Sequence, residues 1–69
     1  MSTYKGVVKF FNTTKGFGFI QPEDGGKDAF VHISAVQRSG LDGLADGEQV
    51  RVTIRQGAKG PEAERVEVV

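Results

Sequence analysis

The chain has 69 residues, the size of one small domain, and we expect residues 1–69 to fold as a single unit. It contains no cysteine, which excludes disulfides and thiolate metal sites. Nine basic and nine acidic side chains give a net charge of zero, which argues against strong non-specific DNA binding. No stretch resembles a signal peptide or a membrane span, so we expect a cytoplasmic protein without a membrane partner.

Five segments have the composition of short strands, because β-branched or aromatic residues alternate in them and turn-forming residues separate them. They are residues 4–11, 15–21, 28–33, 49–56 and 63–69. Between the third and fourth, Ser34 to Gln37 is typical of a single helical turn with Ser34 as its N-cap. Five short strands without a long helix predict an all-β fold, a small antiparallel barrel whose closure removes exposed edges.

The second and third segments carry the most informative pattern. Residues two apart in a strand share a face, so Phe17 and Phe19 lie together, as do Phe30 and His32. Both faces are apolar, and the core can take only one of them. The opposite face offers Gly18, Ile20, Ala29 and Val31, and the fourth strand adds Val50, Val52 and Ile54. This aliphatic set suffices for a core, which leaves the rings facing water. Gly18 further indicates a close backbone approach between the rings.

Positive charge is concentrated at the same end of the chain as the rings. Residues 1–22 contain Lys5, Lys9 and Lys15 and no acid, whereas the remainder carries six basic and nine acidic side chains. Exposed rings beside lysines suit the bases and phosphates of single-stranded nucleic acid. An exposed apolar patch could instead dock a peptide, and a protein-interaction module is the alternative prediction.

Three motifs closely resemble those of the bacterial cold-shock proteins. They are Gly6-x-Val8-Lys9-Phe10-Phe11-Asn12, Lys15-Gly16-Phe17-Gly18-Phe19-Ile20 and Phe30-Val31-His32-Ile33-Ser34-Ala35. The resemblance continues through Gly57-x-Lys59-Gly60-Pro61 and so covers essentially the whole chain. It implies a five-stranded OB-fold barrel that binds single-stranded RNA and DNA. It also implies an RNA chaperone that acts without ATP and affects transcription termination or translation.

The resemblance assigns roles to individual positions. Stacking on bases would fall to Phe10, Phe11, Phe17, Phe19, Phe30 and His32. Lys9, Lys15 and Lys59 would follow the phosphate backbone, and Asn12 and Asp28 would hydrogen-bond base edges, with Gln37 as a further candidate. For Phe11 partial burial is an equal alternative, because adjacent Phe10 and Phe11 cannot share a face in a regular strand. For Asp28 the alternative is a solvated position at a hairpin end.

Several positions depart from the family pattern. Phe10 stands where tryptophan is most frequent, and Ile33 and Leu41 stand where phenylalanine is common. Both aliphatic residues would keep apolar contact with the ligand without a ring, so we expect weaker or shorter binding than is usual in the family. Strand parity places Glu64 on the side of Val66 and Val68, at the barrel rim.

Enzymatic chemistry is not expected. Asp28 and His32 lie about 13 Å apart along one strand, at about 3.3 Å per residue, which is too far for a catalytic triad with Ser34. A lone histidine without cysteine is a poor zinc site. We therefore predict a monomeric binding protein with no metal, no cofactor and no small-molecule substrate.

Overall fold

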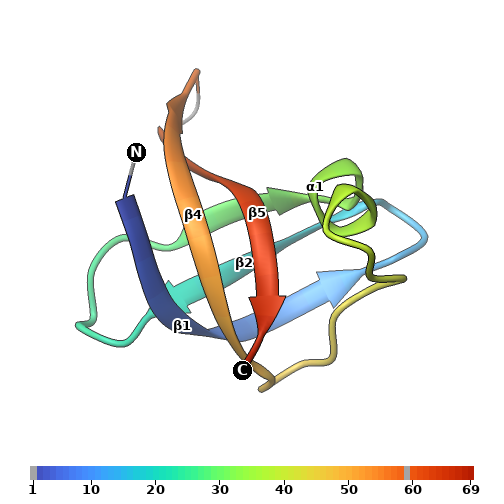
Figure 1. Ribbon diagram of the computed structural model, residues 1–69, viewed down its shortest axis with the longest axis horizontal. Coiled ribbons are helices and arrows are strands. Elements are labelled where there is room, and N and C mark those ends of the chain that lie inside the picture. The colour runs from blue at the N-terminus through green and yellow to red at the C-terminus, as the bar shows by residue number, and fades with distance from the viewer. Residues whose placement is uncertain (1, 59) are drawn as a thin grey trace.

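A computed structural model of the chain describes residues 2–58 and 60–69 (Figure 1). Its elements are β1 (Ser2–Asn12), β2 (Phe17–Pro22), β3 (Ala29–His32), α1 (Ile33–Arg38), β4 (Gln49–Gly57) and β5 (Gly60–Val68). The five predicted strands and the helical turn are all present, with ends displaced by up to three residues. The largest change is at β5, because the β4–β5 ladder continues to the Gly57–Gly60 pair at the hairpin tip. None of the helices in these two ranges is long and apolar enough to cross a membrane.

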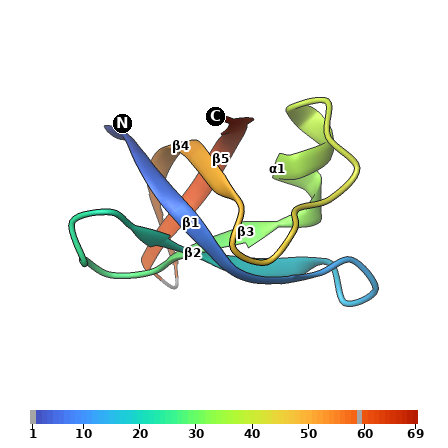
Figure 2. The ribbon, with the colours of Figure 1, turned by 90° about the horizontal axis from the view of Figure 1, so that it is seen from below.

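The strands close into a barrel in the order β1-β2-β3-β5-β4. The predicted all-β, five-stranded barrel is therefore confirmed. Four of the five contacts between neighbouring strands are antiparallel, and β3 with β5 is parallel through Phe30–Glu62 and Val31–Ala63. A ring with an odd number of strands cannot alternate direction at every step, so one parallel contact is unavoidable. In Figure 2, β4, β5 and α1 lie above β2 and β3, and β1 runs from the N-terminus beside β4 down to the level of β2.

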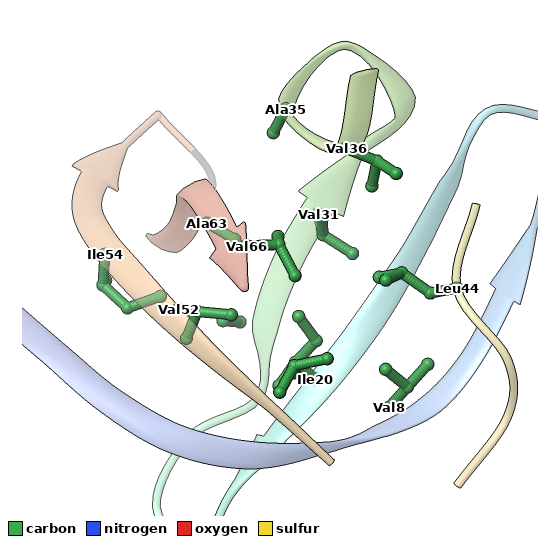
Figure 3. Packing of buried hydrophobic residues seen from close by; sticks show 12 residues of the cluster. Val8, Ile20, Val31, Ala35, Val36, Leu44, Val52, Ile54, Ala63 and Val66 are labelled. Atoms are coloured by element: carbon green, nitrogen blue, oxygen red, sulfur yellow. The ribbon is translucent and has the colours of Figure 1, made fainter. Parts of the chain in front are cut away.

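The core is aliphatic, as predicted. Ile20, Ala29 and Val31 are each 0% exposed, and they meet Val50 and Val52 of β4 in the barrel interior. Figure 3 shows Ile20, Val31 and Val52 converging with the side chains of α1 and with Leu44. Among the described residues no polar or charged residue is buried, so the interior contains no ionisable group that requires a partner.

The short helix is capped by a different residue from the one predicted. The N-cap of α1 is His32, whose Nδ1 accepts a hydrogen bond of 3.1 Å from the Ser34 backbone N–H. The prediction that Ser34 is the cap was wrong. His32 ends β3 in extended backbone, and its ring nitrogen reaches the second helical residue, as cap side chains do.

A bulge in β5 alters the side-chain parity of that strand. The register with β4 pairs Thr53 with Arg65 and Ile54 with Ala63, which leaves Glu64 as an extra residue. Glu64 is partly exposed, as expected for the rim, but it does not share the inward direction of Val66. The parity argument for Glu64 was therefore wrong.

Candidate nucleic-acid interface

Four phenyl rings form one cluster on the outer face of β1, β2 and β3. This phenyl cluster consists of Phe10, Phe17, Phe19 and Phe30. Phe17 and Phe30 are stacked, with ring centroids 5.9 Å apart and planes at 18°. The other close pairs are tilted or edge-on, at 5.7 to 6.3 Å. The rings therefore support one another while leaving ring surface open, and Phe10 remains 41% exposed.

A bulge in β1 brings Phe10 into the cluster. The register pairs Val8 with Ile20 and Phe10 with Phe19, so Lys9 is an extra residue on β1. In a regular strand Phe10 would share the inward face of buried Val8. The bulge reverses this parity and places both Lys9 and Phe10 at the surface.

Phe11 lies apart from the phenyl cluster. It is partly buried and packs against the barrel core, and its backbone N–H donates to Asp46 Oδ1 at 3.2 Å. Of the two alternatives for Phe11, this position corresponds to partial burial. Its ring also lies against Gly18, where a Cβ would overlap Phe11 and the Phe10 carbonyl oxygen. The close approach predicted at Gly18 is thus present.

Of the polar residues predicted for the site, Lys9 and Asn12 lie on β1, Lys15 lies in the β1–β2 turn and Asp28 lies just before β3. Lys9 Nζ donates to Asp28 Oδ2 at 3.0 Å. The residue predicted to contact phosphate and the residue predicted to contact a base edge therefore form an ion pair with each other. Asn12 Oδ1 accepts from the Lys15 backbone N–H at 2.9 Å, which orders the β1–β2 turn. The Lys15 side chain is exposed. Lys59 lies outside the described residues.

The remaining predicted residues lie at one end of β3. His32 is paired with Phe17 and is exposed on the same face. Its Nδ1 also lies 2.9 Å from Ser34 Oγ, but the Asp28 carboxylate is paired with Lys9, so no triad is assembled. Ile33 is the first residue of α1, in contact range of Gly16, and Leu41 packs against the core.

Comparison with known proteins agrees with this arrangement. The family of the 'Cold-shock' DNA-binding domain matches residues 4–69. The chain belongs to the cold-shock domain family. Cold shock-like protein CspE of Escherichia coli K12 and that of Buchnera aphidicola from Acyrthosiphon pisum are each 59% identical to it over 66 residues, 96% of both chains. Cold shock-like protein CspC of Shigella flexneri is 54% identical over the full length of both chains.

Two residues beside the cluster of this cold-shock domain were missed by the sequence analysis. Glu62 of β5 is the register partner of Phe30, and Arg55 of β4 is the partner of Glu62. Nothing in the local pattern of β5 indicates which strand it joins, because the parallel β3–β5 contact joins segments about thirty residues apart. Only the closed barrel brings these charges to the edge of the rings.

Proposed function

We propose that this protein binds single-stranded RNA and DNA, with the bases stacked on the phenyl cluster. The observation that supports the proposal is the set of four rings gathered on one face, Phe10 exposed and the other three partly exposed, above a core that does not need them. Each base stacked on an aromatic side chain contributes about 1–3 kcal/mol to binding. Lys9 and Lys15 would contact phosphates, so affinity would fall with salt, by a slope of about −0.7 for each phosphate neutralised.

Such binding would make the protein an RNA chaperone that works by mass action. A duplex buries the base faces in its own stack, whereas an open strand offers them to the rings. A protein that binds only the open strand shifts the equilibrium toward it without ATP. Effects on transcription termination or translation would follow where weak secondary structure controls those steps. We further propose that it acts as a cytoplasmic monomer.

The test is fluorescence anisotropy of a labelled pyrimidine-rich strand and of its duplex, at two salt concentrations. We expect saturable binding of the strand alone, weakened by salt. Phe17→Ala or Phe30→Ala should each reduce affinity by more than about 1 kcal/mol while the barrel stays folded. Val68→Ala is the matched control, because Val68 is an exposed apolar residue on β5, outside the phenyl cluster.

Unchanged affinity in folded Phe17 and Phe30 variants would refute the stacking mechanism. Binding that is insensitive to salt and to strand length would favour the alternative, in which the same rings dock a peptide.

A further inference from the structure

The row of rings continues across two more strands into a pair of opposite charges. Strand register places Phe19 beside Phe30, Phe30 beside Glu62 of β5, and Glu62 beside Arg55 of β4. Register partners on neighbouring strands have their side chains on the same face of the sheet. The Phe30–Glu62 pair therefore forms the boundary between an apolar and a charged part of one continuous surface.

The inward neighbours confirm the direction of Glu62. Val31 and Ala63, the next pair along the same parallel contact, are 0% and 5% exposed in the core. Since successive side chains alternate between faces, Phe30 and Glu62 both point outward. A base stacked on the Phe30 ring would thus lie on the same face as the Glu62 side chain, one strand away.

Contacts with its own hairpin restrict the Glu62 side chain. Its Oε1 lies 3.9 Å from Arg55 Nε, and 35% of the side chain is exposed. The carboxylate also lies over Gly57, where a Cβ would overlap it. Glu62 is therefore a hydrogen-bond acceptor at the edge of the rings that already contacts its own hairpin.

A polar recess of about 210 Å³ adjoins this carboxylate. His32, Arg55, Glu62 and Arg38 are among the residues that line it. It is smaller than the roughly 300–1,000 Å³ pockets that hold drug-sized ligands. Its volume suits the edge of one base, and its position beside His32 connects it to the stacking face.

The donor and acceptor chemistry of Glu62 distinguishes the bases. An ionised carboxylate only accepts hydrogen bonds, through two oxygens. The Watson–Crick edge of guanine offers two adjacent donors, N1–H and the N2 amino group. Uracil and thymine offer one N–H between two carbonyl oxygens, which would oppose the carboxylate. Arg55 could in addition donate to guanine O6.

The geometry points to Glu62 as a specificity residue that selects guanine for the base stacked at the Phe30 end of the cluster. This inference rests on the proposed function and deepens it. Because the carboxylate also repels phosphates, Glu62 lowers affinity for every strand, and its selective effect is visible only in the ratio between bases.

The test compares thymine strands of about seven nucleotides, within the range that single OB folds bind. One guanine is placed at each position in turn, and inosine replaces it in a matched series. Inosine keeps the purine ring and N1–H but lacks the N2 amino group, so the guanine-to-inosine ratio separates hydrogen bonding from stacking. The variant is Glu62→Gln. The control is Glu67→Gln, which removes the same charge from the other Arg–Glu pair of the hairpin, Arg51–Glu67.

We expect the wild type to bind the best-placed guanine strand about fivefold more tightly than its inosine counterpart, near the lower limit for a paired base contact. In Glu62→Gln the ratio should fall to about one, because the amide has a single acceptor oxygen for N1–H. The Glu67→Gln variant should keep the wild-type ratio. Thermal unfolding should show both variants folded, since exposed ion pairs contribute at most about 1 kcal/mol.

Three results would overturn the inference while leaving the proposed function intact. They are equal affinity for guanine and inosine at every position, a preference that survives in Glu62→Gln, or the same loss of preference in Glu67→Gln. Failure of the wild type to bind any of the strands would overturn both proposals.

Discussion

Lys9 Nζ lies 3.0 Å from Asp28 Oδ2, so the lysine on the β1 bulge and the acid preceding β3 face each other across β2. The two side chains are 50% and 31% exposed, and an ion pair this accessible contributes little to stability. The pair matters for binding because the Asp28 carboxylate competes with phosphate for the Lys9 ammonium group. A phosphate that approaches Lys9 must displace the Asp28 carboxylate or share the ammonium group with it.

Replacing Asp28 should therefore strengthen binding. Asp28→Asn keeps the side-chain shape and removes the charge that competes with phosphate. A surface ion pair contributes up to about 1 kcal/mol, so we expect up to about a fivefold gain in single-strand affinity at low salt. The freed Lys9 should make the salt slope more negative by up to about 0.7. Anisotropy titrations over a range of salt concentrations measure both quantities.

The control for Asp28 is Asp24→Asn. Asp24 lies in the same hairpin loop and accepts from the Gly26 backbone N–H, but it forms no ion pair with a lysine within the described ranges. Its replacement should leave the salt slope unchanged. If Asp28→Asn instead weakens binding at every salt concentration, Asp28 acts as a hydrogen-bonding partner of the bases.

His32 both caps α1 and contributes a ring to the outer face, and two different substitutions can test these roles separately. Its Nδ1 caps α1, and its ring lies beside Phe17 on the outer face. His32→Asn keeps a good cap and loses the ring, so affinity should fall by about 1 kcal/mol or more with stability retained. His32→Phe keeps a ring and loses the acceptor, so unfolding free energy should fall by about 1 kcal/mol with affinity retained.

Urea unfolding and anisotropy on the same two samples test this division. A His32→Phe variant as stable as the wild type would show that the cap contact contributes nothing. Full affinity in His32→Asn would exclude the ring from the binding surface.

The alternating pattern of the strands predicts the two faces of the barrel well. Ile20, Ala29 and Val31 are buried, and Phe17 and Phe30 point outward. Because side chains alternate between the two faces of a strand, burying the aliphatic residues against β4 forces the rings onto the outer face. No such rule predicts the bulges. The extra residues at Lys9 and Glu64 change which side chains share a face, and each is set by the register with the neighbouring strand of its own hairpin.

The cap of α1 and the parallel contact between β3 and β5 also could not be predicted from neighbouring residues in the sequence. Ser34 is the expected cap by residue type, but the extended end of β3 places the His32 ring nitrogen over the first helical turn. The neighbourhood of Phe30 and Glu62 arises only when the barrel closes. The sequence therefore predicts the stacking residues and not the charges that border them.

Replacing Phe10 with tryptophan, the residue most frequent in the family at this position, should strengthen binding. Phe10 is 41% exposed and lies 5.7 Å from Phe19 and 6.1 Å from Phe17, so a larger ring has room at the edge of the cluster. We expect Phe10→Trp to increase affinity by a fraction of the roughly 1–3 kcal/mol that one stacked base contributes. Val68→Trp, which adds an indole outside the cluster, should leave affinity unchanged. An equal gain in both variants would indicate non-specific apolar attraction.

Adding a methyl group at Gly18 should destabilise the barrel. A Cβ there would overlap the Phe10 carbonyl oxygen and the Phe11 ring, and overpacking of this kind costs about 1–3 kcal/mol. Gly25→Ala is the comparison, because nothing lies within 4 Å of its Cβ position but its φ is +79°. That strain alone costs about 1–2 kcal/mol. Urea unfolding should rank Gly18→Ala as the less stable variant, and the reverse order would contradict the close packing at Gly18.

Tyr4 should make the fold sensitive to alkali. Burial against the core raises the pKa of Tyr4 above its ordinary value of 10.0, and the negative charges of Asp24 and Asp28 raise it further. A raised pKa means that the fold favours the neutral phenol. The associated stability is fully present below pH 10.0 and is lost as pH rises through the higher pKa of the folded state.

Tyr4→Phe removes this dependence while keeping the ring. Between about pH 8 and pH 11, the urea midpoint of the wild type should fall more steeply than that of the variant, because lysines titrate alike in both proteins. Tyr4 is the single tyrosine of the chain, so the ultraviolet absorbance of tyrosinate reports its ionisation directly. Parallel stability curves, together with ionisation at the ordinary pKa of a free tyrosine, would show that Tyr4 is equally well solvated in the folded and unfolded states.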